Sequence, residues 1–274
     1  MHVYASLAEF KDYMQQNGST VRTSTADDAV MLTVLESVSR RIDEWCGRGS
    51  GFGPRIGIRY FDNCYEPEVF LEDDLSSASA TVTLGGSVLT IDDDYDLLTG
   101  AGTYGDPPYR RIRRPMYADF GYGRKRLEIE GTWGYPALTR TLTPTTAEAL
   151  DDSETEIDVS ALTGISPGMT LLLGSEQVYV TATTDSTTDS ITVDRGVNGT
   201  TAASHLTGLA ISRIVYDAAV VDACKRVTLR RWRARDAGAD GMDGGGQMGV
   251  IAPREGEDLI LQRTVGHLRI ERVP

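Results

Sequence analysis

The chain has 274 residues, of which 40% are hydrophobic, and a formal net charge of -13 at pH 7. This length and apolar content allow one large domain or two modest ones, either of which can fold without disulfides. The negative charge argues against a protein that coats DNA, because such a protein carries a basic face toward the phosphates.

Three cysteines, Cys46, Cys64 and Cys224, lie far apart and leave one unpaired, which predicts neither a disulfide framework nor a zinc site. The first residues lack the basic and apolar regions of a signal peptide. No apolar run reaches the roughly 18 residues that a membrane-spanning helix needs. We therefore expect a protein that is made in a reducing cytoplasm and has no membrane partner.

Charge is distributed unevenly along the chain. Residues 141–213 contain ten acidic and two basic residues, a net charge of -8, whereas residues 224–274 contain ten basic and seven acidic residues, a net charge of +3. Such asymmetry is typical of a protein that docks onto other charged surfaces.

Two helices are predicted at the N-terminus. Ser6-Leu7-Ala8-Glu9 has the pattern of a capping box and predicts a short helix through Met14, which Gly18 ends. A second helix begins near Ser24 or Thr25. Its apolar residues recur at three- and four-residue steps: Met31, Leu35, Val38, Ile42 and Trp45.

Four glycines between residues 47 and 53 then break the chain. They follow a helix rather than a strand and lack the Lys-Ser/Thr pair of a phosphate-binding loop, so we interpret them as a hinge.

Short stretches rich in β-branched or aromatic residues predict a small antiparallel sheet. They are residues 56–61, 68–71, 81–84, 88–91, 94–98 and 126–131. Gly85-Gly86 suits a two-residue hairpin turn, and the Gly-, Pro- and Tyr-rich residues 99–122 are long enough for a functional arm. Trp133 and Tyr135, in the motif Gly131-Thr132-Trp133-Gly134-Tyr135-Pro136, are expected to pack at a strand end rather than stack on a ligand.

From residue 141 the composition shifts to Thr, Ser and Asp, with predicted strands at residues 155–159, 169–173, 177–181 and 190–193. We expect residues 141–213 to form an inserted all-β domain, barrel- or sandwich-like, which the glycine-containing run of residues 195–205 closes. The flanks, residues 1–140 and 214–274, are interpreted as one core domain of about four helices with a small antiparallel sheet. The fold class is therefore α+β.

Helical periodicity returns at Tyr216. One broad apolar face contains Val220, Val221, Cys224, Val227, Leu229 and Trp232. A flexible glycine-rich break over residues 238–249 precedes a last helix over residues 255–268, whose apolar residues are Leu259, Ile260, Leu261, Val265 and Leu268.

Four arginines crowd the end of the helix that begins near Tyr216, namely Arg230, Arg231, Arg233 and Arg235. Cations there complement the helix dipole and can pair with acids, including those of a neighbouring subunit. We favour ion pairing as the role of these four arginines. Contact with the phosphates of a nucleic acid is the alternative.

No group of residues in the sequence has the pattern of a catalytic or metal-binding site. Asp92, Asp94 and Asp96 begin like a calcium loop, but Leu97 stands where that loop needs glycine and Thr103 where it needs glutamate. The sequence therefore predicts no catalytic residue, no metal site and no cofactor.

The three histidines, His2, His205 and His267, lie near no pattern that would activate a nucleophile or bind zinc. His205 is expected to pack or hydrogen-bond within the inserted domain. Asn198-Gly199-Thr200 matches a glycosylation acceptor, but a turn explains it better in a chain without a secretory signal.

The order of these elements resembles the head-to-tail adaptor, or connector, proteins of long-tailed double-stranded DNA bacteriophages. The matching pieces lie on both flanks of the insert: Leu7-Ala8-Glu9-Phe10-Lys11, Ser39-Arg40-Arg41-Ile42-Asp43-Glu44-Trp45-Cys46-Gly47-Arg48, Asp94-Tyr95-Asp96-Leu97-Leu98, the Gly131 motif and Arg230-Arg231-Trp232-Arg233. The insert is similar to a small β-module of several phage virion proteins. The segments that carry this similarity are Ile165-Ser166-Pro167-Gly168-Met169, Gly174-Ser175-Glu176-Gln177 and Arg195-Gly196-Val197-Asn198-Gly199-Thr200.

This resemblance implies a structural protein of the virion neck, at the head-tail junction. It would form a ring, expected to be twelve-fold to match the portal, that extends the DNA channel and joins head to tail. The implied partners are the portal protein, the stopper or tail-completion protein, further copies of the chain, and genomic DNA that passes without sequence-specific binding. The last helix, with Leu259, Ile260, Leu261, Val265 and Leu268, would dock onto the portal, and the acidic surplus would limit adhesion of DNA to the channel wall.

Two alternatives remain open. The chain could be another virion structural protein, of the decoration or tail-tube type, with the β-insert as its binding surface. An enzyme that acts on DNA or cell-wall sugar is least favoured, because it would need clustered carboxylates or a metal site.

Overall fold

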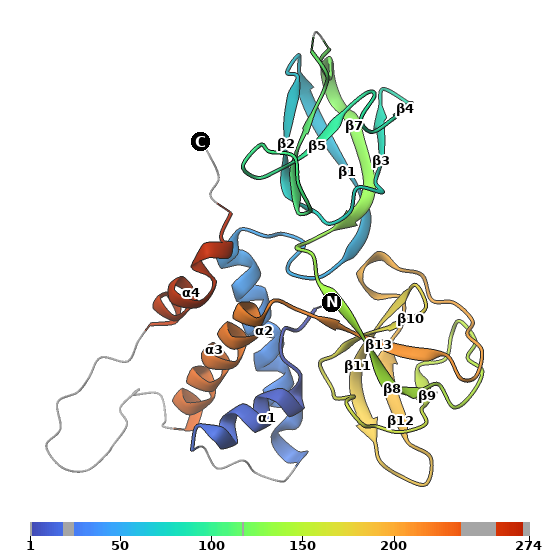
Figure 1. The fold of residues 1–274 in the computed structure, drawn as a ribbon. Coiled ribbons are helices and arrows are strands. Elements are labelled where there is room, and N and C mark those ends of the chain that lie inside the picture. The colour runs from blue at the N-terminus through green and yellow to red at the C-terminus, as the bar shows by residue number, and fades with distance from the viewer. Residues whose placement is uncertain (1, 19–24, 117, 237–255, 271–274) are drawn as a thin grey trace, which may run out of the picture. The chain divides into compact units, whose positions relative to one another are not determined.

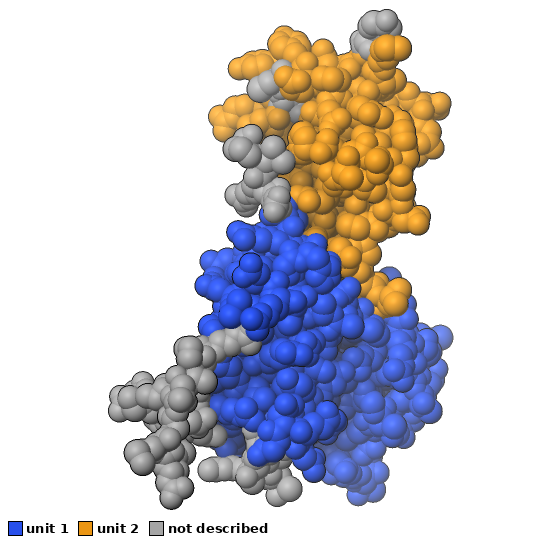
Figure 2. All heavy atoms as spheres, turned by 60° about the vertical axis from the view of Figure 1, so that its left-hand side comes forward, with its two compact units in different colours: residues 1–47, 139–197, 201–274 blue, residues 48–138, 198–200 orange. Residues whose placement is uncertain are grey.

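The computed structural model describes residues 2–18, 25–116, 118–236 and 256–270. Its contacts divide the chain into two compact units (Figures 1 and 2). Unit 1 contains residues 1–47, 139–197 and 201–274, and unit 2 contains residues 48–138 and 198–200. Four α-helices and two antiparallel sheets make up the described part, which confirms the predicted α+β class.

The helices of unit 1 come from both ends of the chain. They are α1 (Leu7–Gln16), η1 (Thr25–Asp27), α2 (Asp28–Cys46), α3 (Ala218–Asp236), α4 (Glu257–Val265) and η3 (Gly266–Leu268). The capping box is present, since the Ser6 hydroxyl accepts from the Glu9 N–H and the Glu9 carboxylate accepts from the Ser6 N–H. Within the described ranges, none of the helices combines the length and hydropathy that crossing a bilayer requires.

These helices close into one bundle. Leu35, Val38 and Ile42 of α2 are fully buried, as are Val220 and Val227 of α3, as the periodicity predicted. Two hydrogen bonds join residues near the ends of the described chain to its interior. His2 Nδ1 lies 2.9 Å from the Tyr216 hydroxyl, and the Ile270 N–H donates to the Cys46 carbonyl at 2.8 Å.

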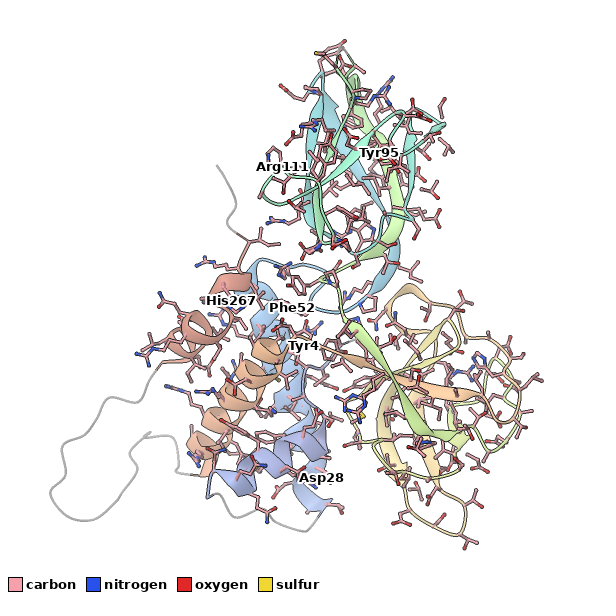
Figure 3. The ribbon with its side chains drawn as sticks, in the orientation of Figure 1. Tyr4, Asp28, Phe52, Tyr95, Arg111 and His267 are labelled. Atoms are coloured by element: carbon pink, nitrogen blue, oxygen red, sulfur yellow. The ribbon has the colours of Figure 1, made fainter. Side chains whose placement is uncertain are left out.

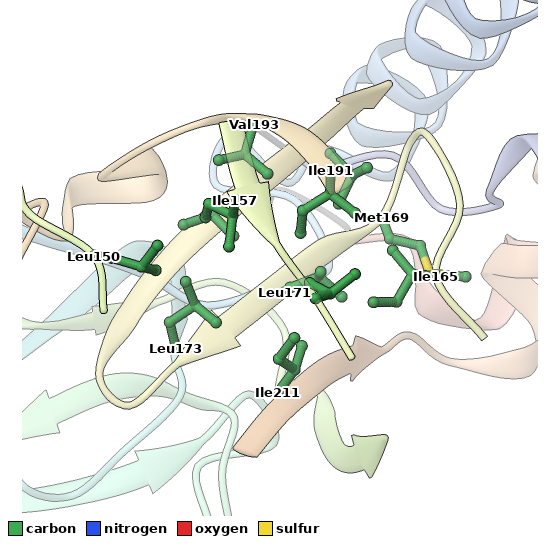
Figure 4. Close-up of a cluster of buried hydrophobic side chains, with 12 residues drawn as sticks. Leu150, Ile157, Ile165, Met169, Leu171, Leu173, Ile191, Val193 and Ile211 are labelled. Carbon is green, nitrogen blue, oxygen red and sulfur yellow. The ribbon is translucent and has the colours of Figure 1, made fainter. Parts of the chain in front are cut away.

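The second element of unit 1 is a six-stranded antiparallel sheet in the order β8-β13-β10-β11-β12-β9. Its strands are β8 (Leu138–Thr145), β9 (Glu156–Asp158), β10 (Thr170–Leu173), β11 (Glu176–Thr184), β12 (Ser190–Asp194) and β13 (Ala210–Val215). Leu171, Ile191 and Ile211 are completely buried in its apolar core (Figure 4). The four predicted strands are confirmed, and β8 and β13 extend the sheet at its boundaries.

The helices and this sheet are joined within unit 1. The Leu7 N–H donates to the Pro167 carbonyl at 2.9 Å, and the Tyr179 hydroxyl donates to the Glu36 carboxylate at 2.7 Å. The compact units therefore divide the chain differently from the expected domains. The helices of residues 1–47 and 218–268 share a unit with the predicted insert, residues 141–213, whereas the predicted small sheet forms the other unit.

Unit 2 is built on a seven-stranded antiparallel sheet in the order β4-β3-β7-β2-β6-β5, with β1 paired to β7. The strands are β1 (Arg55–Cys64), β2 (Glu68–Leu75), β3 (Thr81–Leu84), β4 (Ser87–Leu89), β5 (Asp96–Thr99), β6 (Tyr109–Arg113) and β7 (Tyr122–Trp133). The β3-β4 hairpin turns at Gly85 and Gly86, which both have positive φ, as predicted. Tyr95 and Trp133 are buried in the core of this unit (Figure 3 labels Tyr95).

The predicted long arm of residues 99–122 contains a strand instead. β6 pairs with both β2 and β5, and Ile112 lies opposite Val69 on one side and Leu97 on the other. Ile112 is the one fully buried residue of the Tyr-Arg-Arg-Ile-Arg segment, so the strand carries almost no hydrophobic pattern.

Residues 48–53, which begin unit 2, are closely packed rather than hinge-like. The guanidinium group of Arg48 pairs with the carboxylate of Asp74 and lies 5.1 Å from the Phe52 ring centre and 4.7 Å from that of Tyr135. Arg48 and Phe52 are both buried (Figure 3 labels Phe52). The prediction that Trp133 packs at a strand end is confirmed, and its indole N–H donates to the Gly57 carbonyl at 2.9 Å.

Glycine is required at position 134 on two grounds. Its φ is +110°, and a Cβ there would clash with the Gly53 carbonyl oxygen and lie 3.3 Å from the Gly51 carbonyl oxygen. The Trp-Gly-Tyr motif thus marks the crossing of two backbone segments.

We expect Gly134→Ala to destabilise unit 2 more than Gly86→Ala does. Gly86 also has a positive φ, +88°, but a Cβ there meets nothing within 4 Å, so this control carries backbone strain alone, about 1–2 kcal/mol. The clash at position 134 adds about 1–3 kcal/mol, which urea unfolding monitored by tryptophan fluorescence measures. Equal losses in the two variants would contradict this account of the motif.

Candidate docking surfaces

The apolar residues predicted to dock onto a portal are divided between two sides of α4. Leu261 and Val265 are fully buried and Leu268 nearly so, and α4 packs against α2 and α3. Leu259 is 39% exposed and Ile260 is half-buried. Leu259 therefore lies on the outer side of the packed helix, whereas Ile260 lines a groove beside α3. The predicted glycine-rich break over residues 238–249 lies outside the described residues.

Ion pairs hold the start of α4 on the bundle. Both Nε and Nη2 of Arg231 donate to the Glu257 carboxylate, at 2.9 and 2.8 Å, and Arg41 Nη2 lies 3.1 Å from Asp258 Oδ1. The hydrogen bonds from Arg231 lower the pKa of Glu257, against the opposing effect of its burial. A bidentate pair of this kind is stronger and more directional than a single ion pair.

The four arginines at the end of α3 have different surroundings. Arg231 pairs with Glu257, and Arg235 lies 3.6 Å from Asp27, so these two pair with acids of their own chain. Arg233 donates to the Asn17 carbonyl at 2.8 Å, and Arg230 lines a groove. Contact of these residues with a neighbouring subunit stays a prediction.

That groove, here called the arginine groove, lies between α1, α3 and α4 and has a volume of about 270 Å³. Among the described residues that line it are four arginines and no carboxylate, and its polar lining includes Tyr13, Asn17, Arg226, Arg230, Arg233 and Arg263. Carboxylate neighbours lie outside the lining, where Asp222 pairs with Arg226 at 2.7 Å. The groove is therefore a locally positive surface on a chain of net charge -13.

Unit 2 has a second concave basic surface of about 380 Å³, beside the β3-β4 turn. Arg124, Lys125 and Arg126 line it and are exposed. Next to them Tyr122 stacks on Tyr65 with ring centres 5.9 Å apart, and both rings are 68% exposed. Exposed aromatic and basic side chains together are typical of an interaction surface.

The run of residues 195–205 encloses a buried carboxylate. Glu176, at the start of β11, accepts hydrogen bonds from Arg195 Nε and Nη2 at 2.7 and 2.8 Å and from the Gly196 and Ala203 N–H groups, and it lies 2.8 Å from His205 Nε2. Arg195 also donates to three backbone carbonyls, those of Asp151, Glu154 and Ala203. The prediction that His205 bonds within the insert is confirmed, and the network fixes the closing loop to the sheet.

Glu176 could not be identified as a network residue from the sequence, in which it is one isolated acid among many. Burial alone would raise the pKa of Glu176, but the hydrogen bonds from Arg195, His205 and the two N–H groups lower it to about 2. The carboxylate is 1% exposed, so it is a buried charge that is fully paired.

The acidic residues of the run that begins like a calcium loop make contacts within unit 2. Asp94 accepts from the Thr90 N–H at 2.9 Å, and Asp96 accepts from the Tyr104 hydroxyl at 3.0 Å. Across the residues that the structure describes, no three His, Cys, Asp or Glu side chains are grouped as metal ligands would be. His267 is exposed, and His2 is buried against Tyr216.

Comparison with known proteins adds no relative. A scan of protein-family models, a search of curated proteins and a search of solved structures each gave no match to this chain.

We expect Glu176→Gln to destabilise unit 1 in a pH-dependent manner. The pKa of Glu176 is about 2 in the folded chain and about 4.5 without these contacts, so its ionised form contributes about 3 kcal/mol above pH 4.5. That contribution is lost as the pH falls from about 5 to 2. Urea unfolding at a series of pH values should therefore show a gap between the wild type and the variant that closes in acid.

The matched control is Asp185→Asn, which removes an exposed acid in the loop between β11 and β12. It should change the free energy of unfolding by less than about 0.5 kcal/mol at every pH. A Glu176→Gln effect that is constant from pH 7 to pH 3 would show that the ionised carboxylate is not what stabilises the loop.

Proposed function

We propose that this chain is a structural protein of a tailed-phage neck. Its copies form a ring beneath the portal, with the portal's expected twelve-fold symmetry, and the ring extends the DNA channel and joins head to tail. Its partners are the portal, the stopper or tail-completion protein, neighbouring copies, and DNA that passes without sequence-specific contact. It resides at the head-tail junction of the virion.

One observation carries this proposal, the closure of helices from both ends of the chain into one bundle. The β-rich segments, residues 48–138 and 139–215, are both inserted between α2 and α3. This is the element order on which the resemblance rests, with the β-module placed between the Trp-Gly-Tyr motif and the third helix. The motifs that begin at Leu7, Ser39 and Arg230 therefore lie in one helical bundle, whereas residues 94–98 and the Gly131 motif lie in unit 2.

The described surface also suits a protein that works by assembly. Apolar side chains are exposed along one face of β1, at Ile56, Ile58 and Tyr60, and at Leu259 on α4. Each is 39–49% exposed, and contacts with neighbouring proteins would cover such residues. The acidic surplus, in turn, would weaken adhesion of DNA to a channel wall.

The proposal is tested by mixing the purified chain with the portal of its own phage and imaging the product by electron microscopy. We expect annular complexes that share the portal's axis and symmetry. Immunogold labelling of virions is expected at the head-tail junction. Labelling over the capsid or along the tail, without portal binding, would instead favour a decoration or tail-tube protein.

The outer side of α4 offers a point variant for the same test. We expect Leu259→Glu to weaken portal binding at least tenfold, because a charge would replace an apolar contact, while the free energy of unfolding stays unchanged. Val30→Glu on α2 is the matched control, since Val30 is 40% exposed, as Leu259 is at 39%. Surface plasmon resonance on immobilised portal measures both, and equal affinities of the two variants would exclude α4 from the docking surface.

A further inference from the structure

We infer that a β-bulge of unit 2 binds the phosphate backbone of duplex DNA without reading its sequence. The bulge consists of three consecutive basic residues near the start of β7, Arg124, Lys125 and Arg126, and is here called the basic bulge. The inference rests on the proposed function in its choice of duplex DNA as the ligand. Its test uses the purified chain and needs no ring, so the two proposals can fail separately.

The bulge places all three basic side chains on the surface. Residues 61 and 63 of β1 lie opposite residues 127 and 123 of β7, so the basic bulge, three residues long, lies opposite Asp62 alone. Side chains of a regular strand point alternately to the two faces of the sheet, and a bulge changes their direction. All three residues of the basic bulge are exposed.

The surrounding structure holds the bulge in this conformation. Lys125 has a φ of +50°, in the left-handed region that a residue with a side chain rarely adopts. Its N–H donates to the Asp62 carboxylate at 2.7 Å, which fixes the peptide group at the centre of the bulge. The guanidinium group of Arg126 lies beside Gly85 and Gly121, where the absence of a Cβ leaves it room. A hydrogen-bonded strand therefore presents the three cations.

The described part of the chain provides no ion pair for the basic bulge. By contrast, six of the other seven arginines of unit 2 are ion-paired with acids of the same unit: Arg48, Arg59, Arg110, Arg111, Arg113 and Arg114. Acids are not scarce there, since residues 48–138 contain fourteen acidic and ten basic residues, a net charge of -4. Three exposed cations without an acidic partner in such a unit indicate a negatively charged ligand.

The concave surface beside the bulge has the composition of a phosphate-binding site. Its volume is about 380 Å³, and it is lined by Thr83, Gly85, Gly86, Tyr122, Gly123, Glu128 and the three residues of the basic bulge. Arginine, lysine, threonine and tyrosine side chains all contact DNA phosphates, and glycine lets a ligand approach the backbone closely. Glu128 is the one carboxylate among the described lining residues, so the three cations outweigh it.

These features favour DNA over an acidic protein as the partner. Protein docking surfaces have an apolar core, but the described lining of this concave surface contains no aliphatic side chain. Tyr65 stacks on Tyr122 next to it, and the ammonium group of Lys125 lies 5.5 Å from the centre of the Tyr60 ring. The three tyrosines add hydroxyl groups that can donate to phosphate oxygens. Such a contact carries no sequence information and is weakened by salt, which suits DNA that moves past the protein.

Fluorescence anisotropy of a labelled DNA duplex of mixed sequence tests the inference. The bulge variant carries Arg124→Gln, Lys125→Gln and Arg126→Gln. At about 0.05 M salt we expect it to bind the duplex at least tenfold more weakly than the wild type does. The slope of log K against log salt concentration should fall in magnitude by about 2 to 3, because each phosphate contact contributes about 0.9. A wild-type chain should bind a second duplex of unrelated sequence equally well.

The matched control is a variant of the arginine groove with Arg226→Gln, Arg230→Gln and Arg263→Gln. It also removes three positive charges, from the other concave basic surface, and should change duplex affinity by less than about threefold. Urea unfolding checks that both variants are folded. If the bulge variant does not fold, Arg124→Glu alone serves, since it leaves Lys125 and Arg126 in place, and it should weaken duplex binding at least threefold.

Equal duplex affinity of the wild type and the bulge variant would overturn the inference, as would a wild-type chain that binds no duplex at about 0.05 M salt. Loss of binding in the groove variant alone would assign DNA to the arginine groove instead. Displacement of the duplex by an equal charge concentration of polyglutamate would assign the basic bulge to an acidic protein. None of these results bears on the proposed ring. Duplex binding by a chain that never assembles on the portal would remove the proposed function and leave this site in place.

Discussion

The structure depends on the closure of its helical bundle by segments from both ends of the chain. Tyr216 lies where β13 ends and α3 is about to begin, and its buried ring contacts three separate parts of unit 1. Its hydroxyl lies 2.9 Å from His2 Nδ1 and 3.4 Å from Thr170 Oγ1, and its ring meets that of Tyr4 edge-on at 5.0 Å. Burial raises the pKa of Tyr216, so the hydroxyl stays protonated and can donate. Because these contacts close a long loop of chain, the helices and the six-stranded sheet form one packed body.

Much of the fold could be predicted from local patterns. The capping box of α1, the apolar stripe of α2, the Gly85-Gly86 hairpin and four strands of the six-stranded sheet are all short-range features, and each is found in the structure. β6 could not be predicted, because it has one fully buried residue, Ile112, among arginines that pair or stack at its surface. Arg111, for example, pairs with Glu68 at 2.9 Å and lies 4.4 Å from the centre of the Phe70 ring (Figure 3 labels Arg111). β8 could not be predicted for a similar reason, since its first four residues are all exposed and do not alternate between buried and exposed positions.

The candidate docking surfaces could be predicted only in part from the sequence. A helical apolar stripe has the same pattern whether it packs on its own chain or on a partner, so Leu261 and Val265 could not be distinguished from Leu259. The pairs Arg231 with Glu257 and Arg195 with Glu176 join residues that are distant in sequence, and only the fold brings them together. What the sequence did carry was the separation of charge, acidic in the insert and basic in the C-terminal helices. The structure brings four of the arginines together in one groove, at Arg226, Arg230, Arg233 and Arg263.

The central claim is the proposal that this chain is a ring-forming subunit of a phage neck. A cryo-electron microscopy reconstruction of the head-tail junction tests it most directly. The account predicts a ring of this chain directly beneath the portal and on the portal's symmetry axis. A neck in which the density beneath the portal belongs to another protein would contradict the account.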